Sequence, residues 1–259
     1  MPRFSANLGF LWQDRPLLQR IDAAYAAGFR AVELHWPYDT PPELVRARCA
    51  THGLSLLSIN TPLGRTELGE FGLAALPGRE ADFLEGFKAA HAWATAAGAC
   101  AIHVMAGVVT PETQAAARET LIVNLRTAAA MAPEMTLLLE GLNQHDKPGY
   151  FYSTLEAKAG IVAAVGAKNI RILFDAYHVG RSEGDVFGNL PHHLPLIGHV
   201  QIAAVPSRAE PDEGDVDYAR FFDNLDCLGY SGWVGCEYKP RNDTDSGLAW
   251  LRKMNVTLS

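Results

Sequence analysis

The chain has 259 residues, 48% of them hydrophobic, and its 22 Lys and Arg against 29 Asp and Glu give a net charge of −7. This composition is typical of a soluble globular protein with a sizeable core and excludes a largely disordered chain. Runs of about 18 apolar residues and a secretory cleavage signal are absent from the sequence, and the acidic balance argues against nucleic acid as a partner. We therefore expect a cytoplasmic protein that binds neither membrane nor nucleic acid.

Four cysteines are scattered along the chain without any close pair: Cys49, Cys100, Cys227 and Cys236. This spacing fits neither a zinc site nor a dense disulfide framework. Each cysteine adjoins small or apolar residues, so we expect four buried free thiols in a reducing compartment.

Short apolar runs recur along the chain and predict eight strands. In chain order they are Phe4–Leu11, Ala31–Trp36, Leu54–Asn60, Ala101–Gly107, Thr136–Asn143, Ile170–His178, Ile197–Val205 and Trp233–Lys239. Most runs are continuously apolar and do not alternate, which is typical of parallel strands covered on both faces.

Helical stretches lie between these runs, and several end at a glycine that can close a helix in the left-handed conformation. They are Pro16–Ala27, Glu43–Thr51, Glu80–Ala97, Pro111–Ala132, Thr154–Val165 and Tyr218–Leu228. A helix–Gly–strand rhythm repeated around eight strands predicts a single (β/α)8 TIM-barrel domain over residues 1–259. A doubly wound sheet is the alternative, but the first strand–helix turn lacks a GxGxxG motif. The longest irregular stretch, Thr61–Gly78, should lie over the catalytic end of the barrel.

The last four strands each carry a polar residue near the carboxyl end: Glu140, Asp175, Gln201 and Glu237. One carboxylate after a buried apolar run can be a salt bridge or a helix cap, but burial without compensation costs several kcal/mol. In a barrel these four side chains would converge on one face. Three carboxylates and an amide suit one Mg²⁺ or Mn²⁺, and the lack of imidazole or thiolate disfavours structural zinc.

Several motifs resemble the hydroxypyruvate isomerase family, within the xylose-isomerase-like barrel superfamily. They are RFSANL, AAGFRAVEL, PYD, LPGRE, HVMAG, VNLRTAA, FDAYH, HVQIA and GYSGWVGCEYKP. The resemblance spans nearly the whole chain and implies a single divalent ion held by Glu140, Asp175, Gln201 and Glu237. It also implies that the two glutamates accept and donate the proton.

The chain departs from the usual family pattern at three places. Gly141 and Leu142 replace the usual Pro-Ile after Glu140, Ala204 replaces an Asp, and Arg65 ends the loop that usually reads Asn-Leu-Pro-x-Gly-Asp. The predicted ligands are retained, so we expect the chemistry to be retained while the substrate stays open.

Four further residues are candidates for substrate binding. His178 resembles the family position that contacts a substrate oxygen, and Arg208 is suited to a bidentate pair with a substrate carboxylate. Asp146 and His103 are candidates for the pocket wall. The adjacent His192–His193 pair should diverge along its element, and we expect both on the surface.

The leading hypothesis is an isomerase of a small 2-oxo acid, which converts hydroxypyruvate to tartronate semialdehyde or acts on a 2-oxo-tetronate. Glu140 and Glu237 would move a proton through an enediolate, and the cation would stabilise its charge. A ketose 3-epimerase is the alternative, although its members usually have His in place of Gln201. An abasic-DNA endonuclease needs a zinc-rich site and a basic face, and a sugar-acid binding protein needs no such carboxylates. Related barrels often associate, which leaves a homo-oligomer open.

Overall fold

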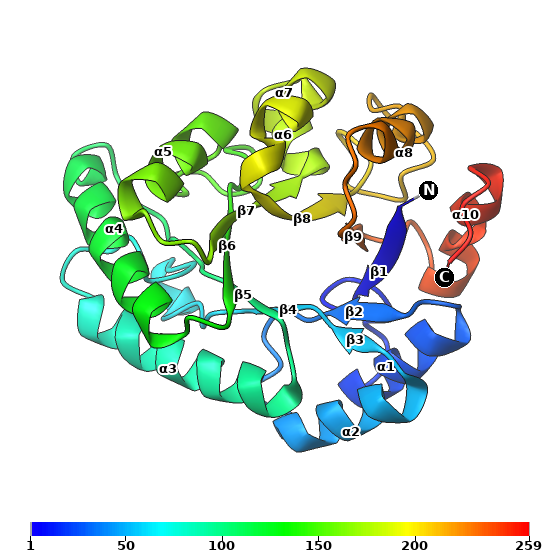
Figure 1. Ribbon diagram of the computed structural model, residues 1–259, viewed down its shortest axis with the longest axis horizontal. Helices are drawn as coiled ribbons and strands as arrows, with labels where there is room; N and C mark the ends of the chain where they lie inside the picture. The colour runs from blue at the N-terminus through cyan, green and yellow to red at the C-terminus, as the bar shows by residue number, and fades with distance from the viewer. Residues whose placement is uncertain (1, 259) are drawn as a thin grey trace.

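Short parallel strands form one sheet that closes into a barrel at the centre of the molecule (Figure 1). The computed structural model describes residues 2–258, and the nine strands found there follow the order β3-β2-β1-β9-β8-β7-β6-β5-β4. They are β1 Arg3–Asn7, β2 Ala31–Glu33, β3 Ser55–Leu56, β4 Ser58–Asn60, β5 Ala101–His103, β6 Thr136–Glu140, β7 Ile170–Asp175, β8 Ile197–Ile202 and β9 Trp233–Cys236.

The ring closes through β3 and β4, which are two pieces of the predicted third strand. Leu57 lies between them, donates its N–H to Val32 O at 2.9 Å and accepts from Ala101 N at 2.8 Å. β3 therefore pairs with β2 and β4 with β5, and the nine pieces occupy eight strand positions. The predicted (β/α)8 barrel is confirmed.

Every predicted strand exists, but most end earlier than their apolar runs. The run Ile170–His178, for example, leaves the sheet after Asp175, whose side chain accepts the backbone N–H of Tyr177 at 2.8 Å and caps α6 (Ala176–Ser182). The remaining residues of such runs form the loops and helix starts at the carboxyl end of the barrel. Apolar composition alone does not show where a strand stops and a capped helix begins.

All six predicted helices are present with ends shifted by a few residues at most: α1 Leu17–Ala26, α2 Pro42–His52, α3 Glu80–Ala97, α4 Gln114–Met131, α5 Leu155–Val165 and α8 Tyr218–Cys227. α3 ends as predicted at Gly98, whose φ of 81° places it in the left-handed region. The short elements α6, α7 (Val186–His193), α9 (Thr244–Gly247), α10 (Ala249–Lys253), η1 (Thr66–Leu68) and η2 (Leu194–Leu196) were not predicted. They span too few turns to show a clear helical period.

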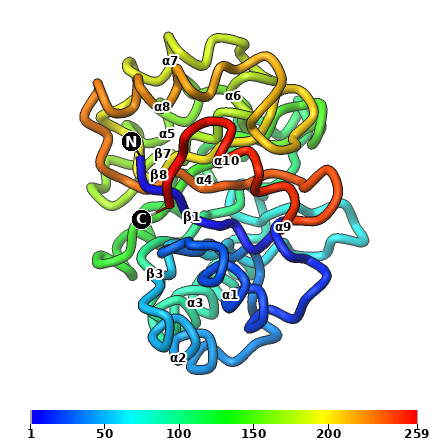
Figure 2. Tube along the Cα trace, turned by 90° about the vertical axis from the view of Figure 1, so that its right-hand side faces the viewer, coloured from blue at the N-terminus to red at the C-terminus, as the bar shows by residue number. Residues whose placement is uncertain are grey.

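The helices surround the barrel, and the C-terminal segment packs beside its first strand. Figure 1 places α10 next to β1, and Figure 2 shows the same red segment passing β1. Trp250 of α10 is fully buried, and its ring meets that of Phe4 at 6.0 Å between centroids. Within residues 2–258, no helix is both long and apolar enough to cross a membrane.

Two expectations about exposure were wrong. All four cysteines are free, but only Cys49 and Cys236 are buried, whereas Cys100 and Cys227 are exposed. The exposed pair lies at the ends of elements, immediately before β5 and in the last position of α8, where neither core nor sheet covers the side chain. His193 is buried and His192 exposed, because α7 packs against α5 and turns one of the two rings inward.

Candidate active site

A cavity of about 440 Å³ opens at the carboxyl end of the barrel strands. Six of the eight predicted site residues line it: His103, Glu140, Asp146, His178, Arg208 and Glu237. The other two, Asp175 and Gln201, are buried near the ends of β7 and β8. Phe71, from the loop after β4, also lines the cavity, which is where that loop was expected. The fold therefore brings separate strand ends to one place.

Each of the four predicted cation ligands has one buried oxygen that lacks a hydrogen-bond partner among residues 2–258. The atoms are Glu140 Oε1, Asp175 Oδ2, Gln201 Oε1 and Glu237 Oε2. A buried polar atom without a partner costs about 1–3 kcal/mol, and most native structures leave few of them. Four such oxygens on adjacent strands are suited to a hard cation or a substrate that supplies the missing interactions.

The carboxylates in this cluster repel one another. Burial raises the pKa of Asp175 to about 7, with a further contribution from Glu237. Burial also raises the pKa of Glu140 well above its ordinary value, and the charges of Glu237 and Asp175 add to the shift. Their negative charge is thus unfavourable without a cation, even though Arg208 partly offsets it.

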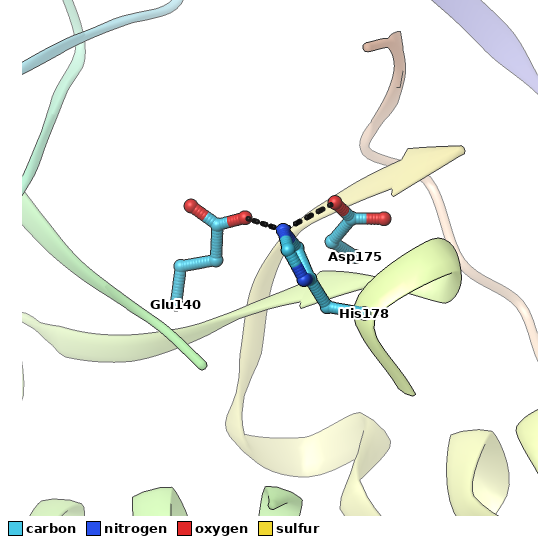
Figure 3. A group of neighbouring side chains, drawn as sticks. All are labelled: Glu140, Asp175 and His178. Carbon is cyan, nitrogen blue, oxygen red and sulfur yellow. Dashed lines mark ion pairs between the residues drawn. The ribbon is translucent and has the colours of Figure 1, made fainter. Parts of the chain in front are cut away.

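His178 lies between Glu140 and Asp175, as Figure 3 shows. Its Nε2 is 3.6 Å from Glu140 Oε1 and 3.7 Å from Asp175 Oδ2, and one ligand atom from each residue falls within 4.8 Å of the others. The backbone N–H of Asn143 donates to His178 Nδ1 at 3.0 Å.

This contact fixes the tautomer of His178. A backbone N–H can only donate, so Nδ1 accepts and the neutral ring carries its proton on Nε2. Burial and then Arg208 lower the pKa of His178 well below its ordinary value, which keeps the ring neutral. Nε2 therefore faces the carboxylate cluster as a hydrogen-bond donor, which suits it to contact an oxygen of a substrate and not to bind a metal ion.

Glu237 is held by a histidine that the sequence analysis did not select. His35 Nε2 lies 2.9 Å from Glu237 Oε1, and an ionised carboxylate can only accept, so the ring donates. The ring of His35 packs on the backbone of Gly9, where an added Cβ would lie 2.2 Å from its Cγ. A glycine at this position is what lets His35 reach the glutamate.

Arg208 extends over the cavity from the loop after β8. Its Nη1 lies 3.6 Å from Asp146 Oδ2 and its Nη2 lies 3.6 Å from Glu237 Oε2, both longer than a hydrogen bond. The guanidinium stacks at 4.9 Å over the ring of Phe10 and at 5.0 Å over that of Tyr177. Burial lowers its pKa, but Glu237 and the other carboxylates outweigh this and raise it, so the side chain stays charged.

The two remaining predicted residues form part of the cavity wall. His103 Nδ1 lies 3.3 Å from Glu140 Oε2, and burial, followed by the nearby charges, lowers the pKa of His103 to about 3. Asp146 accepts from Asn143 Nδ2 at 3.1 Å and from the hydroxyl of Tyr177 at 2.8 Å. His103 is thus neutral beside Glu140, and Asp146 joins the loop after β6 to α6 at the rim.

Comparison with known proteins places this arrangement in a family. Residues 21–254 match the family described as xylose isomerase-like TIM barrel. The chain belongs to this family. It is 45% identical to 2-oxo-tetronate isomerase of Cupriavidus necator, covering 97% of this chain and 98% of that protein. It is 38% identical to hydroxypyruvate isomerase of Escherichia coli, again over 97% and 98% of the two chains.

A solved structure supports the same family membership. The crystal structure of an AP endonuclease, family 2, from Brucella melitensis superimposes with a TM-score of 0.94 at 39% identity. The match covers 98% of this chain and 99% of that one. The resemblance inferred from the motifs is therefore confirmed for the family and the fold.

Sequence reasoning missed Glu33 as well as His35. Glu33 is fully buried at the end of β2 and accepts the side-chain N–H of Gln201 at 2.7 Å. A signal was present, because Glu33 is a carboxylate within the apolar run Ala31–Trp36, as Glu140 is within Thr136–Asn143, and His35 follows at the two-residue spacing that returns a strand side chain to the same face. The predicted cation ligands come from the last four strands alone, because each of these strands has a polar residue near its carboxyl end.

Proposed function

We propose that the chain is an isomerase of small 2-oxo acids that carry a hydroxyl group, with hydroxypyruvate or a four-carbon 2-oxo-tetronate as substrate. The names of its relatives support this class of reaction. The observation that carries the proposal is the set of four buried, unpartnered oxygens on Glu140, Asp175, Gln201 and Glu237 among the described residues.

One divalent cation, Mg²⁺ or Mn²⁺, fits these residues. The donor set is three carboxylates and one amide oxygen, which hard cations prefer, and the raised pKa of Asp175 and Glu140 reflects negative charge that a cation would relieve. When bound, the cation would supply positive charge that stabilises an enediolate and polarises the carbonyl group.

Glu140 and Glu237 are the proposed proton carriers. One carboxylate removes a proton from the hydroxyl-bearing carbon beside the carbonyl group, and the C–H electrons form the double bond of an enediolate. The other carboxylate delivers a proton to the former carbonyl carbon, while the proton of the original hydroxyl passes to the former carbonyl oxygen. Hydroxypyruvate then becomes an aldehyde with a secondary hydroxyl, and a 2-oxo-tetronate becomes its 3-oxo isomer. The hydrogen bond from His35 orients Glu237 for this step, and the raised pKa of Glu140 favours its protonated form, which suits a group that carries a proton.

Two further groups contact the substrate in this proposal. His178 Nε2–H points into the cluster and can donate to the oxygen that changes between carbonyl and hydroxyl. Arg208 stays charged above the cavity and has a buried Nε without a partner among residues 2–258, so it can bind the substrate carboxylate. An uncharged ketose offers no such group, which favours a 2-oxo acid over the epimerase alternative.

The test is turnover of hydroxypyruvate, 2-oxo-tetronate and free ketoses by the purified protein. We expect the 2-oxo acids to isomerise with Mg²⁺ or Mn²⁺, chelation to abolish turnover, and added cation to restore it. Epimerisation of a ketose without any turnover of the 2-oxo acids would support the 3-epimerase instead. Full 2-oxo acid turnover after chelation would contradict the role of the cation.

A further inference from the structure

Glu33 is a buried carboxylate that lies inside the barrel and takes no part in the proposed proton transfer. Its two oxygens have different partners. Oε1 accepts from the hydroxyl of Ser5 at 2.5 Å and lies 3.0 Å from His199 Nε2. Oε2 accepts from Gln201 Nε2 at 2.7 Å and from Asn7 Nδ2 at 3.5 Å. Glu33 is therefore surrounded by donors.

The contact with Glu33 decides which end of the Gln201 amide faces the proposed cation site. A side-chain amide has a donor end and an acceptor end of nearly the same shape, and only the oxygen can bind a cation. Because an ionised carboxylate only accepts, Glu33 takes the NH₂ group of Gln201. Oε1 of Gln201 is left buried and without a hydrogen-bond partner in the described chain.

Room for this contact is provided by Gly235. This glycine of β9 is in register with Gln201 on β8 and with Ser5 on β1, so it lies between the strand of Gln201 and the strands from which Glu33 approaches. A Cβ at position 235 would lie 2.3 Å from Glu33 Oε1 and 2.8 Å from the Cγ of Gln201. The bare backbone lets Glu33 reach past two strands to the amide.

We propose that Glu33 is a positioning residue that fixes the amide of Gln201 with its oxygen toward the cation site. The inference rests on the proposed function, since it requires Gln201 to be a ligand. Removing a partner that orients a metal ligand typically weakens metal binding about 10–100-fold. Loss of Glu33 should weaken cation binding by a factor in this range, although Glu33 contacts neither the cation nor the substrate.

The experiment measures the affinity of the full-length protein for Mn²⁺ and its thermal unfolding without metal. Glu33→Gln should raise the Kd for Mn²⁺ about tenfold or more, because the new amide accepts as readily as it donates and no longer dictates the orientation of Gln201. The matched control is Ser5→Ala. It removes a partner of Oε1 but keeps the Oε2 contact with Gln201, so its Kd should stay within about threefold of the wild type.

A compensating exchange separates positioning from general damage to the structure. In the double variant Glu33→Gln, Gln201→Glu, the ligand at position 201 offers an oxygen whichever way it turns, and the amide at position 33 can donate to it. We expect this variant to recover most of the lost affinity. Should Glu33→Gln alone fail to fold, the double variant and Glu33→Asp, which is one methylene too short to hold Gln201, allow the same comparison.

The outcomes distinguish this inference from the proposed function. A wild-type protein that binds no Mn²⁺ would overturn both. Tight binding by wild type and by Glu33→Gln alike would overturn only the positioning role. An equal loss in Ser5→Ala, or no recovery in the double variant, would show that Glu33 merely supports the barrel and would also overturn it.

Discussion

Two buried glutamates at the ends of barrel strands, Glu33 on β2 and Glu140 on β6, are in opposite electrostatic states. Burial raises the pKa of Glu33, but the ion pair with His199 and the hydrogen bonds to the carboxylate outweigh it and hold the pKa below its ordinary value. Burial raises the pKa of Glu140, and the neighbouring carboxylates raise it further. Both oxygens of Glu33 have hydrogen-bond partners, whereas Glu140 has an oxygen without a partner among residues 2–258.

The difference separates two halves of the barrel. Strands β6 and β7 end in Glu140 and Asp175, whose negative charge is made unfavourable by burial and by neighbouring carboxylates, which is typical of groups arranged for chemistry. Strand β2 ends in Glu33, which accepts a hydrogen bond from Gln201. His35, two residues further on, is hydrogen-bonded to Glu237. In our proposals, residues of the first half of the chain orient the cation ligands that the second half supplies.

The largest effect should come from the two proposed proton carriers. Glu140→Gln and Glu237→Gln should each lower kcat about 10²-fold or more, the scale of losing a positioned acid–base group. Glutamine keeps an oxygen for the cation, so metal occupancy should fall less than activity. Steady-state kinetics together with metal analysis of each variant provides the measurement.

The route of the hydrogen can be followed in D₂O. Proton transfer through an enediolate should place deuterium on the carbon that gains a proton, whereas a hydride shift generally relies on two metal ions and moves the substrate's own hydrogen. Because a shielded carboxylate can return the same proton, retention alone decides nothing. Retention together with near-normal rates in both glutamine variants would exclude proton transfer by these residues.

A smaller but more selective effect is expected at Arg208. Arg208→Ala should raise KM for a 2-oxo acid about 10–100-fold, because a charge-assisted pair with the substrate carboxylate is lost. Any turnover of an uncharged ketose should change far less. Equal changes for both substrates would show that Arg208 supports the site, for instance through Glu237, and does not bind the carboxylate.

Much of the fold and part of the candidate site could be predicted from the sequence. The barrel and the six long helices followed from apolar runs and their spacing, and the four ligand candidates followed from polar residues at consecutive strand ends. His35 bonds to Glu237, which lies 202 positions further along the chain, and Glu33 bonds to Gln201, which lies 168 positions further along. Such contacts cross the barrel interior, so the local signal at Glu33 and His35 does not show which residues they bond to. α6 was missed because Asp175 ends the strand by capping a helix inside the run Ile170–His178, whose mostly apolar composition does not mark that boundary.

Cation binding should depend on pH through Asp175. Its pKa is raised to about 7 by burial and by Glu237, so below pH 7 a cation must displace a proton. The affinity for Mn²⁺ should therefore weaken as pH falls, by roughly tenfold per unit for each proton displaced. Titrations between pH 5.5 and about 8 would measure the slope. A flat profile would show that the carboxylates are already ionised without metal.

The smallest effect concerns stability, and it tests the two glutamates directly. In metal-free protein at pH 8, Glu33→Gln should lower the free energy of unfolding by about 1–3 kcal/mol, because a paired buried carboxylate is lost. Glu140→Gln should raise it by about 1 kcal/mol, because repulsion among the carboxylates is relieved. At roughly 2–4 °C per kcal/mol, both changes can be measured by thermal unfolding.

The pH dependence of the two variants should have opposite signs. The pKa of Glu33 is lower in the folded state than in the unfolded state. The ionised carboxylate therefore stabilises the fold above the unfolded-state pKa, and this stabilisation is lost as pH falls through the folded-state pKa. The loss of unfolding free energy caused by Glu33→Gln should thus become smaller in acid. The pKa of Glu140 is higher in the folded state than in the unfolded state, so the wild-type fold loses stability as pH rises from the unfolded-state pKa toward the folded-state pKa. The extra stability of Glu140→Gln should therefore vanish near pH 4. Saturating Mn²⁺ should reverse the order of wild type and Glu140→Gln, because the cation stabilises the ionised glutamate. If both substitutions destabilised equally with and without Mn²⁺, the contrast between a paired and an unpaired carboxylate would be wrong.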